Sequence, residues 1–327
     1  MTSNQTDAQI STALSAVAAR DAVREIFFVA CGGSYAHMLP NQYIVEREAV
    51  AIVGHALNAA EFKACAPKRL GKSSIVIACS HSGTTPETVE AVKIARAAGA
   101  LTISLTHDLG SPLDEASEYT VSYVHSPQTM SPVHSAAVLT RLTFGILEAR
   151  EGNSKVPALT EALAKLPALV DKIAQDRKTD IAAFAEAHKR APLIYTMASG
   201  ANYGVAYSFA ICILQEMQWI NSAAIHAGEY FHGPFEITDF DVPFIQLIGL
   251  GPSRTMDERA LAFAKKYSKC MTVLDAQELG LAALPDSVSE YLTPLVFSPF
   301  LRIYAEKLGA SRGHPLTVRR YMWQMEY

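Results

Sequence analysis

The sequence predicts an α/β protein made of two duplicated, doubly wound parallel sheets. Apolar runs typical of buried parallel strands alternate with helical patterns along most of the chain, and the two halves resemble each other. With 327 residues the chain is long enough for two such domains. We predict one domain over residues 1–155 and a second over residues 156–327.

The first half contains five strand patterns. The clearest is Ile26–Cys31, which is apolar at every position, as a strand covered on both faces requires. The other strands are expected at Val50–Val53, Ile75–Cys79, Leu101–Leu105 and Tyr119–Tyr123, with helices at Ile10–Ala19, Glu87–Ala98 and Ser135–Glu151.

Residues Val156–Arg190 have a helical pattern with apolar and charged faces, which we interpret as the bridge between the domains. The second half then repeats the alternation. Its strands are expected at Leu193–Thr196, Ala223–His226, Phe244–Ile248 and Met271–Leu274.

A duplication is indicated by two segments that match at one spacing. Ala30–Tyr35 (ACGGSY) is similar to Ala198–Tyr203 (ASGANY), 168 positions later. The same spacing sets Ser80–Gly83 opposite Ile248–Gly251, which is another junction between a strand and a loop. Because only the first of these loops is rich in hydroxyl groups, we expect a specific ligand in the first half.

The loop Ser80–Pro86 (SHSGTTP) has the form of an anion site. It joins an apolar strand to a helix for which Thr85 is the expected N-cap and Pro86 the first residue. Unpaired N–H groups and the positive end of a helix dipole favour a bound phosphate, to which the hydroxyls add donors. The alternative is an ordinary capped helix, with Glu87 meeting the dipole.

Composition and charge exclude several classes of function. A net charge of −4 with scattered basic residues argues against nucleic-acid binding. No apolar run is long enough to span a membrane, and the first nine residues lack a signal-peptide core. The five cysteines are widely spaced, so we expect reduced, mostly buried thiols in a cytoplasmic protein.

Glu216 is a candidate catalytic base. It is the one formally charged side chain between Arg190 and Glu229, within an apolar helical segment, Ala206–Ile220. A carboxylate in such surroundings must be paired or hold a raised pKa, both of which are common at active sites. The alternatives are a narrow polar stripe shared with Gln215 and Gln218, or a place at a dimer surface.

The segment His226–Glu236 (HAGEYFHGPFE) contains a second candidate, His232. Two histidines and two acids could suggest a metal site, but its glycines and proline favour a loop over one continuous helix, and zinc-peptidase spacing is absent. We therefore expect no metal, and a histidine able to reach a ligand. A capping or core histidine is the alternative.

The C-terminal segment Gly313–Tyr327 is aromatic and basic. We expect its apolar residues to hold it against the protein, which would let Arg319 or Arg320 meet an anionic substrate. A tail that packs only for stability or for dimer contact is the alternative.

Taken together, these motifs resemble the sugar isomerase (SIS) family, and in particular its tandem members, over nearly the whole chain from Val23 onward. The carrying motifs are Cys31–Ser34, Ser80–Thr85, the Glu216 helix and the Gly228–Pro234 loop. The resemblance implies two flavodoxin-like domains and an enzyme acting on a sugar phosphate. It also implies a homodimer with a shared active site and a reaction that needs no cofactor.

The resemblance implies roles for individual residues. Glu216 would be the base at C1–C2, and His232 the acid and base for ring opening and oxygen protonation. The substrate would be held by Gly32, Gly33, Ser34, Ser80, the backbone of His81, Ser82 and Thr85, with Arg319 or Arg320 from the tail.

Within the family, the chain looks closer to the fructosamine-6-phosphate deglycases than to glucosamine-6-phosphate synthase. The synthase carries a second acid and a lysine where Phe209 and Ile213 stand here, and a tail lysine near Arg319 and Arg320. The chain begins near the first SIS half, so no glutaminase domain is expected. The implied reaction releases glucose 6-phosphate and an amine from a phosphorylated Amadori sugar. A phosphosugar isomerase, an ammonia-dependent synthase and a non-catalytic sensor are the alternatives.

Overall fold

The computed structural model describes residues 3–125 and 130–326. The chain divides into two compact units, one made of the described residues of Met1–Ser126 and Ser131–Lys165, the other of those of Pro127–Met130 and Leu166–Tyr327. The division falls inside helix α7 (Val156–Asp176), at whose first residue we had expected the second domain to begin.

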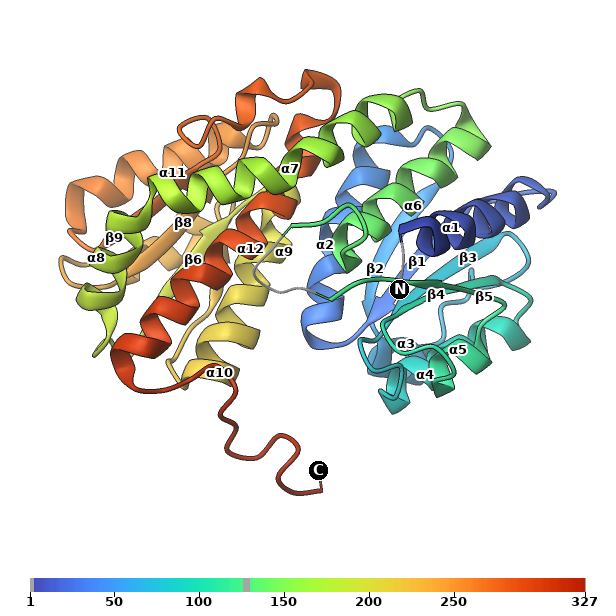
Figure 1. The fold of residues 1–327 in the computed structure, drawn as a ribbon, viewed down its shortest axis with the longest axis horizontal. Helices are drawn as coiled ribbons and strands as arrows, with labels where there is room; N and C mark the ends of the chain where they lie inside the picture. Colours follow the sequence, from blue (N-terminus) through green and yellow to red (C-terminus); the bar gives the residue numbers. More distant parts are fainter. Residues whose placement is uncertain (1–2, 126–129, 327) are drawn as a thin grey trace. The chain divides into compact units, whose positions relative to one another are not determined.

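The first unit is a five-stranded parallel sheet with helices on both faces (Figure 1). Its strand order is β2-β1-β3-β4-β5, which is the flavodoxin-like order that we expected. The strands are β1 (Glu25–Ala30), β2 (Val53–Asn58), β3 (Ser74–Cys79), β4 (Leu101–Thr106) and β5 (Tyr119–Ser122). Every residue of β1, β3 and β4 is buried, which explains their apolar sequences.

Two groups of helices cover this sheet. Helices α1 (Ser3–Ala18), α2 (Gly32–Glu48) and α6 (Ser135–Glu151) pack together, and α3 (Ala59–Cys65), α4 (Pro86–Ala97) and α5 (Pro112–Ala116) form a second layer. The core beneath α3 and α4 is built from side chains of the sheet and of these two helices, among them Phe27, Phe62 and Val76.

The second unit is a four-stranded parallel sheet in the order β7-β6-β8-β9. Its strands are β6 (Tyr195–Ala198), β7 (Ala224–His226), β8 (Phe244–Ile248) and β9 (Met271–Asp275). Its helices are α8 (Lys178–His188), α9 (Tyr203–Ser208), α10 (Glu216–Gln218), α11 (Arg254–Tyr267) and α12 (Asp286–Arg312), with 3-10 turns η1 (Gly200–Asn202), η3 (Tyr230–His232), η4 (Pro234–Ile237) and η5 (Leu281–Ala283).

Strand register confirms the duplication. Phe28 pairs with Ala56 and Ile77, and Thr196, 168 positions later, pairs with Ala224 and Ile245, each also 168 positions later. Helix α11 likewise begins 168 positions after α4. The halves diverge after their fourth strands, because the region equivalent to β5 belongs to the long helix α12 in the second unit.

Some boundaries differ from the sequence predictions. The second strand runs over Val53–Asn58 instead of Val50–Val53, because the backbone N–H groups of Val50, Ala51 and Ile52 donate to the Glu151 carboxylate rather than to a neighbouring strand. Val50 itself is 94% exposed. Helix α1 begins earlier than expected, β6 starts two residues later, and the bridging segment is two helices that meet at Arg177.

The cysteines are free thiols, as expected, but they are not mostly buried. Cys79 and Cys212 are buried, Cys31 and Cys270 are half-buried, and Cys65 is exposed. None of the helices in the described residues combines the length and apolar character needed to cross a membrane.

Candidate functional site

The hydroxyl loop, Ser80–Thr85, lies where β3 leads into α4. Strands β1 and β3 are neighbours in the sheet although β2 separates them in sequence, so their connections leave in opposite directions. The carboxyl ends of two such strands form the crevice in which open α/β sheets bind ligands. The hydroxyl loop and the start of α2 therefore face one recognised binding position.

The hydroxyls of the loop are paired with one another. Ser80 Oγ lies 2.8 Å from Thr85 Oγ1, and Ser82 Oγ lies 2.6 Å from Thr84 Oγ1. Thr85 is the N-cap of α4, as predicted, but its hydroxyl bonds to Ser80 and not to the helix backbone. These short local pairs present several donors beside the positive end of a 12-residue helix.

Gly83 permits the turn of the hydroxyl loop. Its φ of +64° lies in the left-handed region, and a Cβ at this position would come within 2.0 Å of Ser111 Oγ. A side chain at position 83 would therefore displace the segment that follows β4.

The first residues of α2 form the other side of this crevice. Gly32 has a φ of +55°, which turns the chain from β1 into the helix, and Gly33 and Ser34 follow in the first turn. The Ser34 hydroxyl contacts the Cys79 thiol, whose pKa burial raises to about 11, so the thiol stays protonated. The helix starts and the hydroxyls are thus anchored at adjacent strand ends.

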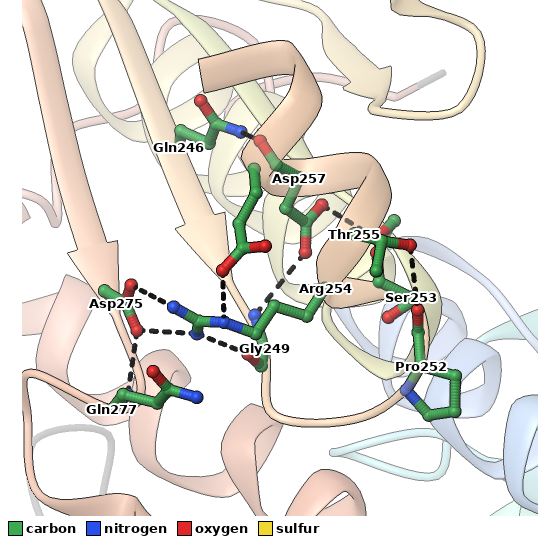
Figure 2. Close-up of polar contacts among 11 residues, drawn as sticks. Gln246, Gly249, Pro252, Ser253, Arg254, Thr255, Asp257, Asp275 and Gln277 are labelled. Atoms are coloured by element: carbon green, nitrogen blue, oxygen red, sulfur yellow. Dashed lines mark hydrogen bonds and ion pairs between the residues drawn. The ribbon is translucent and has the colours of Figure 1, made fainter. Parts of the chain in front are cut away.

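The equivalent loop of the second unit, the twin loop Ile248–Ser253, makes different polar contacts (Figure 2). The Asp257 carboxyl group, fully buried, accepts a hydrogen bond from Ser199 Oγ at 2.7 Å and from the Gly249 N–H at 3.5 Å. Burial raises the pKa of Asp257 to about 7. Arg254, which follows the loop, forms a bidentate ion pair with Asp275. Its Nη1 and Nη2 atoms lie 2.8 and 2.7 Å from the two carboxylate oxygens.

Glu216 is placed by an irregular helix in the second unit. The helix runs through α9, then a π-helical segment η2 (Phe209–Gln215), then α10, which Glu216 begins. A π-turn widens the helix and re-aims the side chains that follow it, and such turns are frequent at functional sites. The segment ends at Trp219, whose φ of +55° is left-handed.

The Glu216 carboxylate is paired with Arg319 of the tail. Arg319 Nη2 lies 2.8 Å from Glu216 Oε1, and the arginine side chain is only 7% exposed. Burial raises the pKa of Glu216, while Arg319 and, further away, Arg302 act to lower it. Because the effect of burial is the larger, the pKa of this carboxyl group stays above its ordinary value.

A cavity of about 680 Å³ opens beside this pair. Arg320 lies over the Trp219 ring, with its Cζ 4.3 Å from the ring centroid, and so forms part of the wall. The lining residues are Gln215, Glu216, Trp219, Ile220, Asn221, Arg319, Arg320, Tyr321 and Met322. The alternative of a polar stripe fails for Gln218, which is buried and donates to the His314 carbonyl.

His232 is not among the residues that line this cavity. It is the last residue of η3, and it is exposed. The segment around it is a loop of short 3-10 turns, as its glycines and proline predicted. The described residues contain no group of three or more His, Cys, Asp or Glu side chains placed to hold a metal ion.

The C-terminal tail is held by its apolar residues only in its first part, where Leu316 is 7% exposed. Tyr321, Trp323 and Met325 are 62%, 74% and 59% exposed. Beyond Leu316, the contacts of Arg319 with Glu216 and of Arg320 with Trp219 attach the tail. Aromatic composition alone did not distinguish these two ways of anchoring a segment.

Two features of these sites are not among the predictions made from the sequence. The π-turn before Glu216 leaves no mark that we recognise in the sequence. The second feature is a set of histidines that come within three residues after the ends of β3, β4 and β5, namely His81, His107 and His125. They are visible in the sequence, and their repeated position after strands was the available signal.

Comparison with known proteins places these features in a family. A model of the SIS domain matches residues 21–146, which hold the first sheet and the hydroxyl loop. The fructosamine deglycase FrlB of Bacillus subtilis (strain 168) is 50% identical over 305 residues, covering 93% of each chain. The chain belongs to the SIS family.

Two further comparisons agree with this assignment. The fructoselysine 6-phosphate deglycase of Escherichia coli (strain K12) is 28% identical, over 91% of this chain and 85% of its own. A Bacillus subtilis crystal structure described as a phosphosugar isomerase superposes with a TM-score of 0.95 at 47% identity, and covers 100% of both chains. The SIS protein described here is accordingly an enzyme with the tandem SIS fold.

Proposed function

We propose that this SIS enzyme is a deglycase that converts 6-phosphorylated fructosamines to glucose 6-phosphate and a free amine or amino acid. The observation that carries the proposal is the 50% identity to a fructosamine deglycase across 93% of both chains. The paired, half-buried Glu216 supports it, because enolisation next to a carbonyl needs a base of moderately raised pKa.

The hydroxyl loop is the proposed anchor for the substrate phosphate. Ser34, Ser80, Ser82 and Thr85 would donate from their hydroxyls, with backbone N–H groups of Gly32, Gly33 and His81. A phosphate held at the start of α4 fixes one end of the open sugar chain, so remote binding energy orients the reacting end.

Glu216 is the proposed base. It takes a proton from C1 of the open-chain substrate while His232 supplies a proton to the C2 oxygen, and the product is an enaminol. Protonation at C2 then gives an imine at C1, which water hydrolyses to the aldose and the amine. No metal or organic cofactor is needed, because the substrate carbonyl accepts the electron pair.

Arg319 is the proposed partner that keeps Glu216 ionised. The 2.8 Å pair offsets part of the cost of burying the carboxylate. The tail would thus serve the base directly, with Arg320 at the wall of the cavity in reach of an anionic substrate.

We further propose a homodimer whose active sites combine residues of two chains. The exposed His232 lies outside the Glu216 cavity, and the exposed Trp219, Tyr321 and Trp323 flank or adjoin it, which supports completion of the site by a second copy.

Free cysteines support a reducing, cytoplasmic setting. We also propose residue 155/156, at the start of α7, as the border between the SIS domains.

Complementation tests the shared site. If Glu216 and His232 act from different chains, mixed dimers of Glu216→Gln and His232→Ala each contain one intact site, and a statistical mixture regains about a quarter of wild-type activity. Homogeneous preparations of either variant stay inactive. Mixtures that remain inactive after verified subunit exchange would show that both residues act within one chain.

A coupled assay tests the reaction. The enzyme is incubated with 6-phosphorylated fructosyl amino acids and fructosyl amines, and glucose 6-phosphate is detected through a dehydrogenase. We expect release from at least one of these substrates and no interconversion of simple hexose phosphates. The reverse pattern would replace the deglycase proposal by a phosphosugar isomerase.

A further inference from the structure

Five of the ten histidines gather at the carboxyl edge of the first sheet. We name this set the histidine row. Its ring centroids are spaced 5.1 Å for His81–His107, 4.4 Å for His81–His125, 6.3 Å for His125–His134 and 6.4 Å for His134–His37. The row begins inside the hydroxyl loop, because His81 follows Ser80 directly.

This edge of the sheet contains few permanent positive charges. The chain has no lysine or arginine between residues 73 and 92, and none between Arg96 and Arg141. The loops that follow β3, β4 and β5 therefore carry histidine as their only basic residue. A dianionic phosphate in the hydroxyl loop would meet neutral donors, with Asp108 nearby as an unfavourable charge.

In the absence of a ligand, burial disfavours the protonated form of three of the five imidazoles in the row, those of His37, His81 and His134. Burial lowers the pKa of His37 to about 4 and that of His134 to about 3, and it also lowers the pKa of His81. Neighbouring imidazoles add to these shifts, because one protonated ring disfavours a second. Asp108 acts on His81 in the opposite direction.

Hydrogen bonds connect members of the row and leave a ring nitrogen that can accept a proton. His107 Nδ1 donates to the Tyr123 carbonyl oxygen at 3.0 Å, so its Nε2 is the nitrogen that takes the next proton. The backbone N–H of His107 donates to the backbone carbonyl of His81 at 3.0 Å. The ring atom Nδ1 of His81 lies 3.2 Å from Tyr123 Oη. Polar groups near the row include Asp108, the Thr106 and Ser135 hydroxyls, and the Cys79 thiol beside Tyr123.

We propose that the histidine row takes up a proton from solvent when a phosphate dianion enters the hydroxyl loop, and that the resulting imidazolium supplies the positive charge that this site otherwise lacks. The proton returns to solvent when the phosphorylated product leaves. The proposal rests on the proposed function, since it requires a phosphorylated ligand in this loop. It makes His81, His107 and His125 binding residues for the phosphate end of the substrate.

The proposal predicts an affinity that depends on pH with a definite sign. A bound dianion raises the pKa of a nearby histidine, so binding should tighten as pH falls from about 8.5 to about 6.5. Below about pH 6 the phosphate monoester itself becomes protonated, and the gain should end there.

Calorimetry with glucose 6-phosphate tests the proposal without turnover. Titrations at pH 7 in two buffers of different ionisation enthalpy give the number of protons bound per ligand. We expect net proton uptake by the wild-type protein, at least halved in His107→Gln/His125→Gln. His55→Gln is the matched control in the same unit, because a glutamine amide can still donate to Glu25.

Each outcome decides the matter. Uptake in wild type and His55→Gln that falls in the double variant supports the histidine row. Tight binding with no dependence of the heat on buffer, and with the same pH profile in all three proteins, overturns it while leaving the phosphate loop intact. An absence of binding would overturn the proposed phosphate site together with this inference.

Discussion

The hydroxyl loop of the first unit and the twin loop of the second occupy equivalent places, 168 positions apart, and they differ in what fills them. Both follow a strand paired in the same register, and both lead into a helix. In the first loop four hydroxyls form two local pairs, and Ser82 Oγ also accepts from the backbone N–H of Thr84. In the second the Asp257 carboxyl group takes the hydrogen-bond donors, so the chain itself occupies the anion position (Figure 2).

This comparison separates what the backbone provides from what the side chains decide. A strand, a turn and a helix start create a polarised crevice in both units. Asp257 together with the Arg254–Asp275 pair closes one crevice, whereas Ser80, Ser82 and Thr85 leave the other available. We infer that duplication allowed one unit to keep an anchor while the other supplied Glu216 for chemistry.

The largest expected effect comes from Glu216→Gln. The amide fits the same space but cannot accept the C1 proton, so kcat should fall by roughly 10²–10⁴ with KM nearly unchanged. Steady-state kinetics on a phosphorylated fructosamine measures this. A kcat equal to wild type would mean that Glu216 is structural.

The next effect should come from the hydroxyl loop. Removing two donors in Ser80→Ala/Thr85→Val should raise KM by about 10–100-fold, with a smaller change in kcat. Ser253→Ala, at the equivalent N-cap of the twin loop, is the control and should leave KM within about twofold. Equal effects at the two loops would contradict the assignment of the phosphate to the first unit.

A moderate effect is expected from Arg319→Met. Because Arg319 lowers the pKa of Glu216, its removal should shift the acid limb of the pH–rate profile to higher pH. Activity should then fall most at low pH, where the carboxyl group is protonated. Arg319→Lys keeps the positive charge, so its acid limb should lie close to that of the wild type. An acid limb that is unmoved in both variants would exclude the proposal that Arg319 keeps Glu216 ionised.

The smallest effect on activity is expected from Asp257→Asn. The pKa of Asp257 is raised from 3.8 to about 7 in the folded protein, so its contribution to stability is full below pH 4 and is lost as pH rises to 7. Relative to Asp257→Asn, the wild type should therefore lose free energy of unfolding across this range, at roughly 1.4 kcal/mol per unit of pKa difference. Denaturant unfolding at several pH values measures it, and a difference that does not vary with pH would contradict the buried position.

Much of the fold could be predicted because its signals are local. Strands β1, β3 and β4 are buried on both faces, and β8 is fully buried too, so continuous apolar runs marked them. The edge strand β2 was misplaced because its sequence is mixed and the preceding turn depends on Glu151, about 100 residues away. The order of strands followed from the family resemblance and not from the runs themselves.

The candidate sites were predicted less completely, because their decisive contacts are distant in sequence. Glu216 stood out as an isolated charge, but nothing local indicated the π-turn or which tail arginine would pair with it. Asp257 was not among the candidates, because nothing local in the sequence indicates that this acid in the first turn of α11 is buried. The histidine row required the sheet order, which brings loops far apart in the sequence to one edge.

One pair of binding measurements tests the division between an anchoring unit and a chemical unit most directly. Glu216→Gln and Ser80→Ala/Thr85→Val are titrated calorimetrically with the same phosphorylated fructosamine, and each is assayed for glucose 6-phosphate release. The account predicts that Glu216→Gln binds with wild-type affinity and releases nothing, whereas the loop variant binds far more weakly and still turns over at high substrate concentration. Lost binding in Glu216→Gln together with unchanged binding in the loop variant would contradict it.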